Sequence, residues 1–452
     1  MSPITSRLAA GICTALLSAT LFATAAAATP FAPVDRPGPR LTVNPRLLAA
    51  SIKCTGDLRK SGVEPVLLVP ATTVDSEQNF GWNYEPVLAA HGIPYCTSDL
   101  PGDDAYNMDD IQNRADYLVY SIRTMYARAG DRKIAMIGAS QGGEASRWPL
   151  RFWPDTRPMV SDVIALDSPN HGSTSVNTIC SIPCAPALWQ QTYNSHYMQA
   201  LNSYQETFAG ISYTNIATTT DDFVEPNSPG NSTVFLTGPS QITNAFIQDI
   251  CPGTIAEHLS VATTNPIAVD LALDAITHPG TANTARIDRS ACTAGPFAQG
   301  VPAAESASRF ATASAQVTRE LATAPTVNTE PPLRCYVYAS CPITSTSRDP
   351  ATPAIAATPA RKECLSRRTI LIHLAHSPRI RSARVTIAGH AVPTRLAGRR
   401  GVRVSLRSLP KGAFTVHIIA HTRRGIRTTT RRYRTCIPRM LRQRGRGAQS
   451  GS

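Results

Sequence analysis

Short apolar runs alternate with amphipathic stretches along residues 65–288. Between two of the apolar runs, apolar residues recur at helical spacing from Ile111 to Met125, and Gly130 ends that pattern. Alternating strands and helices predict a doubly wound, mostly parallel α/β sheet, and Ser308–Leu321 is expected to form one further helix. The runs typical of buried strands are VLLVP (66–70), IAMIG (134–138), VIALD (163–167) and TNIATTT (214–220).

A different pattern follows residue 343. Residues 344–362 carry spaced prolines among Ala and Thr, a composition that favours an extended linker. Beyond the linker, apolar and polar residues alternate with period two, which predicts a small antiparallel, sandwich-like all-β domain over residues 363–437. The basic tail, residues 438–452, is expected to be disordered. The alternating segments are TILIHLA (369–375), ARVTIAG (383–389), GVRVSLRSL (401–409) and FTVHIIAH (414–421).

The first 28 residues combine an early Arg7, an apolar run and an alanine-rich end, which is the pattern of a secretory signal peptide cleaved near Ala28. A membrane anchor is the alternative, but Thr, Ser and Gly interrupt the apolar run. No later segment is expected to span a membrane. The sequence therefore predicts a secreted, extracellular protein with a signal peptide (1–28), an α/β domain (29–343), the linker and the β domain.

The two domains differ sharply in charge. Residues 361–452 hold 23 of the 44 Lys and Arg residues but one of the 31 acidic residues, so this part carries +22 and the rest of the chain −9. Such a basic module is attracted to anionic surfaces. Export and the scarcity of aromatic rings argue against nucleic acid as the partner. An anionic cell-wall polymer or a lipid interface fits better, and the alternative is that arginine only covers the polar faces of a soluble domain.

Ten cysteines remain after Cys13, which lies in the predicted signal peptide. An even number in an exported chain favours disulfides. The close pairs Cys180/Cys184 and Cys335/Cys341 could also be half of a metal site, but no second Cys or His pair at ligand spacing accompanies them, so no metal is expected. The ten are Cys54, Cys96, Cys180, Cys184, Cys251, Cys292, Cys335, Cys341, Cys364 and Cys436.

The stretch Gly138-Ala139-Ser140-Gln141-Gly142 matches the G-x-S-x-G elbow and has the required strand before it and helix after it. Glycine is needed because the turn is tight and the flanking chain crowds the serine. We therefore expect Ser140 to be a nucleophile, although an ordinary Gly/Ser turn is the alternative. A serine hydroxyl needs an adjacent base to become reactive, and in this fold an acid and then a histidine follow the serine in the chain.

Four histidines of the α/β domain follow Ser140: His171, His196, His258 and His278. His171 comes too soon unless Asp162 or Asp167 is the acid, His196 lies on a polar stretch, and His278 closes an apparent helix where a cation is favourable. His258 lies in an irregular segment after the last predicted strand of the domain, where a base is expected. For the acid, Asp221 and Asp222 both follow the strand TNIATTT, and spacing alone does not choose between them.

About half of the chain, residues 66–288, resembles the fungal lipase B family, the α/β-hydrolases typified by the Candida antarctica enzyme. The resemblance implies that Ser140 is the nucleophile, Asp221 the acid and His258 the base. It implies that Thr72 and the backbone N–H of Gln141 form the oxyanion hole, and that Gln191 lines the substrate pocket. The segments that carry it are VLLVPATT, FGWNYEPVLAAHGIPYC, SQGGEASRW, APALWQQT, TNIATTTDDFVEP and AEHLS.

The resemblance also implies the disulfides Cys54–Cys96 and Cys251–Cys292, the second of which brackets His258. Proximity suggests the pairs Cys180–Cys184, Cys335–Cys341 and Cys364–Cys436. This chain has Gly138 where the family's best-known member has threonine, and residues 180–184 fall where a short lid helix is expected. The basic β domain has no counterpart in the resemblance.

Together these features predict a secreted serine hydrolase that cleaves carboxylic esters, lipids among them, and that requires no cofactor and acts as a monomer. An acyltransferase or polyester depolymerase would use the same residues. A protein of another class, an inactive hydrolase fold that binds anionic surfaces through its basic domain, is the third hypothesis. The presence of Ser140, Asp221, His258 and Thr72 together argues against it, because an inactive protein has no reason to retain all four.

Overall fold

The computed structural model divides into two compact units near residue 352, and each is described by itself. In the first unit it describes residues 30–341 except 61, 63, 102–105, 294, 296, 298 and 299. In the second it describes residues 369–373, 380–387, 390–392, 394–397, 401–405, 413–422 and 425–434. The predicted signal peptide, linker and basic tail lie outside the described residues. The predicted domain boundaries stay a prediction.

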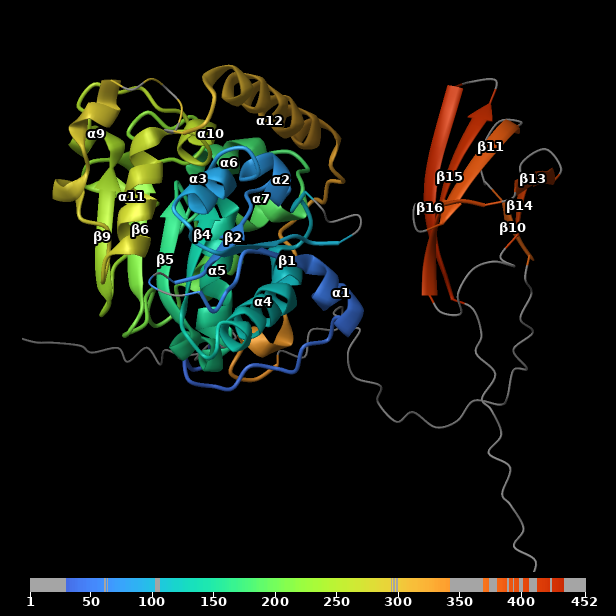
Figure 1. Cartoon of the computed structure of the whole chain (residues 1–452). Coiled ribbons are helices and arrows are strands. Elements are labelled where there is room, and N and C mark those ends of the chain that lie inside the picture. The colour runs from blue at the N-terminus through green and yellow to red at the C-terminus, as the bar shows by residue number, and fades with distance from the viewer. Residues whose placement is uncertain are drawn as a thin grey trace, which may run out of the picture. The chain divides into compact units, whose positions relative to one another are not determined.

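A seven-stranded sheet runs through the first unit in the order β1-β3-β2-β4-β5-β6-β9 (Figure 1). β1 pairs antiparallel with β3, and every other pair in this sheet is parallel. Parallel strands are covered by helices on both faces, which explains why β2 is apolar and buried at every position. The strands are β1 (Ile52–Thr55), β2 (Val66–Val69), β3 (Tyr95–Ser98), β4 (Ile134–Ala139), β5 (Val160–Leu166), β6 (Ser212–Ala217) and β9 (Gln241–Phe246).

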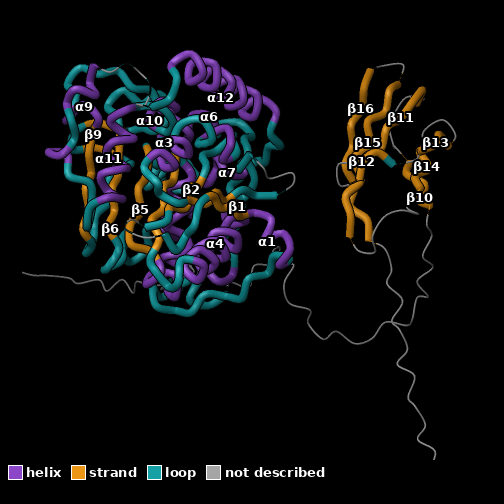
Figure 2. The backbone as a smooth tube through the Cα atoms, viewed as in Figure 1, coloured by secondary structure: helices purple, strands orange, loops and turns teal. Residues whose placement is uncertain are grey.

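Helices cover both faces of this sheet (Figure 2). The α-helices are α1 (Pro45–Ser51), α2 (Ser76–Asn79), α3 (Tyr84–Ala90), α4 (Arg114–Arg128), α5 (Gln141–Phe152), α6 (Thr174–Ile179), α7 (Pro186–Gln190), α8 (His196–Leu201), α9 (Ile247–Ile250), α10 (His258–Val261), α11 (Pro266–Thr277) and α12 (Ala303–Thr323). The 3-10 helices are η1 (Ile111–Asn113), η2 (Pro154–Met159), η3 (Thr284–Arg286), η4 (Arg289–Thr293) and η5 (Cys335–Val337), and a short hairpin joins β7 (Asn227–Ser228) to β8 (Asn231–Ser232).

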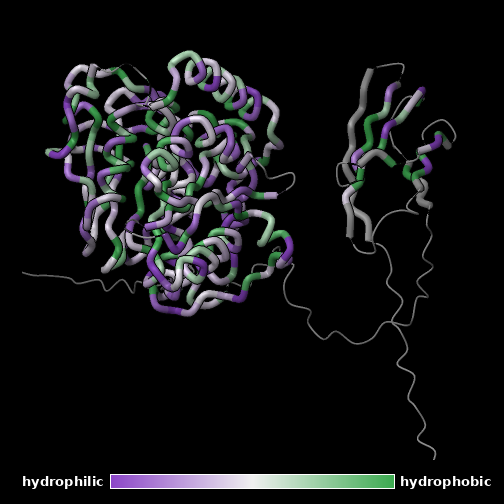
Figure 3. Tube along the Cα trace, in the orientation of Figure 1, coloured by the Kyte–Doolittle hydropathy of each residue, from purple (hydrophilic) through white to green (hydrophobic). Residues whose placement is uncertain are grey.

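Alternate residues of one strand supply the two cores of this unit. Val66 and Leu68 of β2 pack with α3 and α11, whereas Leu67 and Val69 pack with α4 and α5. The apolar strands at the centre of the unit stand out in Figure 3. The central strands are therefore packed on both faces.

The four predicted strands of the α/β domain are confirmed as β2, β4, β5 and β6, and the predicted helix after Ile111 as η1 and α4. The helix predicted over Ser308–Leu321 extends to Ala303–Thr323. Strands β1, β3 and β9 were not predicted. The segment after Glu257 was expected to be irregular, but it forms the short helix α10, because the Glu257 carboxylate accepts the backbone N–H groups of Leu259 and Ser260 and so caps it.

One stretch of the described residues, His258–Thr277, is long and apolar enough to cross a membrane. However, 78% of an 18-residue apolar segment within it is buried inside the first unit, where α11 packs against the central sheet. Burial of this extent is typical of a core helix.

The second unit consists of two antiparallel sheets, ordered β10-β14-β13 and β12-β11-β15-β16. Valine and isoleucine side chains from both sheets form one core, among them Ile372, Val404 and Ile418, so the described strands have the sandwich-like arrangement that was predicted. The disulfide suggested between Cys364 and Cys436 lies outside the described residues. The strands are β10 (Thr369–His373), β11 (Ile380–Ile387), β12 (His390–Ala391), β13 (Thr394–Ala397), β14 (Gly401–Ser405), β15 (Ala413–Thr422) and β16 (Gly425–Arg434).

Candidate active site

Ser140 lies on a sharp turn between β4 and α5. Its backbone φ is +48°, in the left-handed region that a serine rarely adopts, and its N–H donates to the carbonyl of Leu166 on the neighbouring strand. The turn also requires glycine at position 142, where a Cβ would lie 2.0 Å from the carbonyl oxygen of Val69. The elbow therefore holds the Ser140 side chain above the end of the sheet.

Two loops at the same edge of the sheet bring a histidine and an aspartate to Ser140. His258 begins α10, and its Nε2 lies 2.9 Å from the Ser140 Oγ. Its Nδ1 lies 3.1 Å from the Asp221 Oδ2, on the loop that follows β6. The structure thus brings together all three residues that the resemblance implied, in the order nucleophile, base and acid.

Asp222 points to a different part of His258. Its Oδ1 accepts the backbone N–H of His258 at 3.1 Å, whereas Asp221 faces the imidazole and accepts the N–H groups of Phe223 and Val224 through its other oxygen. The two neighbouring acids, which spacing alone did not separate, therefore make different contacts.

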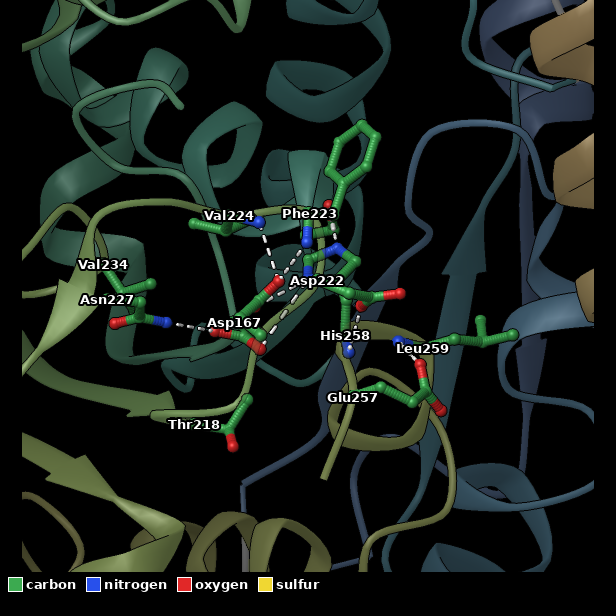
Figure 4. A network of polar contacts seen from close by, with 12 residues as sticks. Asp167, Thr218, Asp222, Phe223, Val224, Asn227, Val234, Glu257, His258 and Leu259 are labelled. Atoms are coloured by element: carbon green, nitrogen blue, oxygen red, sulfur yellow. Dashed lines mark hydrogen bonds and ion pairs between the residues drawn. The ribbon is translucent and has the colours of Figure 1, made fainter. Parts of the chain in front are cut away.

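A second carboxyl group approaches the same imidazole nitrogen. Asp167 follows β5, its side chain is fully buried, and its Oδ2 lies 3.6 Å from the His258 Nδ1. Figure 4 shows the amide of Asn227 directed at the other oxygen of Asp167, at 3.2 Å. Sequence reasoning considered Asp167 only as a partner of His171; its position after a buried strand was the signal that it belongs to this edge.

Burial and the neighbouring Asp221 carboxylate raise the pKa of Asp167 well above its ordinary value. Burial alone would raise the pKa of Asp221 too, but the charge of His258 and hydrogen bonds from Asp167 and His258 lower it below its ordinary value. Burial would likewise lower the pKa of His258, yet the Asp221 carboxylate raises it well above the usual range. These shifts favour the neutral form of Asp167 and the charged form of Asp221 beside the imidazole.

The other three candidate histidines pair with other acidic residues. His171 Nε2 is 2.8 Å from the Glu206 carboxylate rather than facing Asp162 or Asp167. His196 is exposed and pairs with Glu330 at 2.8 Å, and His278 follows α11, where it lies 3.2 Å from Asp274 of that helix.

The side chains of Thr72, Gln141 and Gln191 contact one another next to Ser140. The Gln141 Nε2 and the Gln191 Nε2 each donate to the Thr72 Oγ1 at 3.2 Å. As the first residue of α5, Gln141 has no intrahelical acceptor for its own backbone N–H. Thr72 lines the cavity beside Ser140, but Gln191, which was expected to line the substrate pocket, is fully buried behind Thr72 because its amide is held by Thr72 and by the Ala187 carbonyl.

A cavity of about 460 Å³ lies beside Ser140 and His258. Its walls are mostly apolar and include Leu188, Phe223 and the side of α12 that carries Phe310, Val317 and Leu321. A neighbouring cavity of about 440 Å³ shares Glu257 and Phe310 with it but is lined by neither Ser140 nor His258. The cavity beside Ser140 therefore has the size and character of a site for an apolar ligand.

Comparison with known proteins shows a likeness to lipases. No family model matches the chain. A curated relative, lipase B of Pseudozyma antarctica, is 29% identical over 245 residues, which are 53% of this chain and 70% of that protein. The crystal structure of Aspergillus fumigatus lipase B superposes with a TM-score of 0.59 and 25% identity, over 67% of this chain and 74% of that one. The chain resembles lipase B and has the α/β-hydrolase fold. This likeness supports an ester hydrolase as its enzyme class.

Four disulfides join the described part of this lipase B-like hydrolase: Cys54–Cys96, Cys180–Cys184, Cys251–Cys292 and Cys335–Cys341. They are the four expected pairs that fall on described residues. Cys251–Cys292 closes the chain around the loop that presents His258, and Cys180–Cys184 closes the short segment before α7.

By composition, Asp167, Asp221 and His258 are also a set that could hold a cation, since one ligand atom from each lies within 4.8 Å of the others. In the lipase B-like hydrolase, however, these atoms face one another, and His258 uses its second nitrogen for Ser140. The arrangement fits proton transfer from a serine hydroxyl better than metal binding.

Proposed function

We propose that this lipase B-like hydrolase is a secreted serine ester hydrolase that cleaves carboxylic esters, lipid esters among them, through an acyl-enzyme. The observation that carries the proposal is the unbroken contact series from Asp221 through His258 to the Ser140 Oγ, at 3.1 and 2.9 Å, beside an apolar cavity. The lipase relatives support ester or lipid substrates.

In the proposed reaction, His258 Nε2 takes the proton of Ser140 as its oxygen attacks the ester carbonyl carbon. The Thr72 hydroxyl and the Gln141 backbone N–H stabilise the negative oxygen of the tetrahedral intermediate, an effect worth roughly 3–4 kcal/mol per donor. The charged Asp221 orients the imidazole and stabilises its positive form. The intermediate collapses, and His258 returns the proton to the leaving alcohol.

Water then attacks the acyl-enzyme with His258 again acting as base, which releases the carboxylic acid and restores Ser140. An alcohol in place of water would give acyl transfer, and a polymeric ester would make the same residues a depolymerase. The mostly apolar walls favour a fatty acyl group over a polar one.

Secretion is part of the proposal. It is supported by the signal-like first 28 residues and by the four disulfides, which are rare in reducing compartments. We also propose that the basic second unit retains the enzyme on an anionic surface such as a cell-wall polymer, because residues 361–452 carry a charge of +22.

A fluorophosphonate probe tests the proposed chemistry. We expect stoichiometric labelling of Ser140, located by peptide mapping, and no labelling of the Ser140→Ala variant. A panel of p-nitrophenyl esters from C2 to C16, together with an emulsified triglyceride, would give the acyl preference. Failure of the wild-type protein to react with the probe would refute the proposal and leave the inactive surface-binding hypothesis.

A further inference from the structure

A buried arginine lies behind the proposed oxyanion hole. Arg114, the first residue of α4, is 3% exposed. Its guanidinium donates to the Gln141 Oε1 at 2.6 Å and to the carbonyl of Pro70 at 3.1 Å. A guanidinium carries donors only, so the oxygen of the Gln141 amide must face Arg114 and the nitrogen must face away from it.

The Gln141 nitrogen extends this chain of hydrogen bonds from Arg114 to Thr72, which lines the cavity. It donates to the carbonyl of Asn107 at 3.0 Å and to the Thr72 Oγ1 at 3.2 Å. The Gln191 nitrogen donates to the same hydroxyl oxygen at 3.2 Å, and the hydroxyl in turn donates to the Gln191 oxygen over a longer distance, 3.4 Å. A hydroxyl oxygen has two acceptor positions, and two amide donors occupy both. Among the described residues, the proton of this hydroxyl has only the long contact with the Gln191 oxygen as an acceptor, so it can turn to an oxygen bound in the cavity that Thr72 shares with Ser140.

We propose that Arg114 is a positioning residue of the oxyanion hole, which orients the Gln141 side chain so that the Thr72 hydroxyl donates its proton into the cavity. This rests on the proposed function, because it assigns an oxyanion role to Thr72. It gives the Gln141 side chain a part separate from that of its backbone N–H. Arg114 itself does not touch the substrate.

The charges around Arg114 agree with this role. Burial lowers the pKa of Arg114 to about 10, with Tyr197, Asp99 and Glu144 opposing the shift, so the guanidinium stays charged at neutral pH. From this cation the donors run in one direction, through the Gln141 amide to the Thr72 hydroxyl. Hydrogen bonds aligned in this way polarise one another, and a buried site screens them little.

The test replaces Arg114 and compares it with a matched arginine. Arg147 of α5 is also buried, at 2% exposed, but it donates to Asn170, Asn202 and the carbonyl of Glu206, away from Thr72. Arg114→Met and Arg147→Met both remove a buried guanidinium and are both expected to lower the melting temperature. Only Arg114→Met is expected to lower kcat on a soluble p-nitrophenyl ester, with little change in KM.

The expected loss for Arg114→Met is roughly tenfold in kcat, less than the roughly 10²–10³ for removing an oxyanion donor, because the Thr72 hydroxyl is misaligned and not lost. In the Thr72→Val background, which lacks the hydroxyl but keeps the backbone N–H, Arg114→Met should have no further effect. Gln141→Met breaks the same series while leaving Arg114 in place, and it should match Arg114→Met even if that variant folds poorly.

Several results would overturn the proposal. These are wild-type kcat in Gln141→Met or in a folded Arg114→Met, equal losses in Arg147→Met and Arg114→Met, or effects of Arg114→Met and Thr72→Val that multiply. Labelling of the wild-type protein with fluorophosphonate distinguishes failure of the Arg114 proposal from failure of the proposed function. If the wild-type protein reacts with the probe but any of these results is found, the role of Arg114 is refuted and the proposed function still stands.

Discussion

Two buried carboxyl groups face one nitrogen of His258, and their replacement by asparagine tests which of them carries the charge. The Asp221 Oδ2 lies 3.1 Å and the Asp167 Oδ2 3.6 Å from the His258 Nδ1. The first distance is a hydrogen bond and the second is only an ion-pair distance, yet both carboxyl groups are close enough to interact electrostatically with the imidazole. The opposite directions of their pKa shifts distinguish them, because the raised pKa of Asp167 favours its neutral form and the lowered pKa of Asp221 favours its charged form.

The loss of kcat expected for Asp221→Asn follows from the distance between Asp221 and His258. When His258 takes the Ser140 proton, its positive charge lies 3.1 Å from the Asp221 carboxylate. Two unit charges at that separation attract by about 5 kcal/mol at an effective dielectric constant of about 20. Since about 1.4 kcal/mol is a factor of ten in rate, Asp221→Asn should lower kcat by between about 10³ and 10⁴.

Because its raised pKa favours the neutral acid, Asp167→Asn puts a neutral amide of similar shape in its place and should change kcat by only about two- to threefold. Asp222→Asn is the exposed-loop control, since an amide oxygen still accepts the backbone N–H of His258. The assay is kcat on a soluble p-nitrophenyl ester at pH 8, with thermal melting to verify folding. Equal losses in the Asp167 and Asp221 variants would refute the reasoning, because they would mean that the charge is shared.

Three further predictions concern pH, stability and the second unit. Because His258 must be neutral to act as base and its pKa is raised, kcat/KM should rise with pH through a midpoint above 6.5, which a pH–rate profile checks. Burial raises the pKa of Glu144 well above 4.5, so the free energy of unfolding should fall by up to about 1.4 kcal/mol per pH unit as pH rises above that value. Urea titrations at several pH values check this, because the unfolding free energy of Glu144→Gln should depend less on pH. Truncation after Pro359 should leave soluble-ester hydrolysis intact but abolish salt-sensitive retention on anionic beads, whereas equal retention of both forms would contradict the surface-binding role.

The central strands could be predicted because parallel strands are buried on both faces, and a run such as Val66–Val69 has no other good location in a soluble fold. β9 was missed because it lies at the edge of the sheet, where only its last two residues are buried and Gln241 and Asn244 interrupt the apolar pattern. β3 was missed for another reason: all four of its residues are buried, but its sequence, YCTS, contains no apolar run that would reveal a strand.

The elbow at Ser140 could be recognised because it is a local turn with a fixed demand for glycine. The choice between Asp221 and Asp222 depends on the direction of two adjacent side chains, which spacing does not encode. Arg114 was also missed, since a single arginine at the start of a helix is normally exposed and only the folded chain buries it behind Thr72.

Helix α12 contributes a wall of the cavity while adding little to the core. Of its 21 residues only Ser306, Ala313 and Gln316 are buried, yet Phe310, Val317 and Leu321 line the cavity. Substitutions at sites that carry little packing usually change stability by less than about 0.5 kcal/mol. Divergence or directed evolution can therefore reshape the substrate range of this enzyme along one helix, without the loss of folded protein that ordinarily limits changes near a nucleophile.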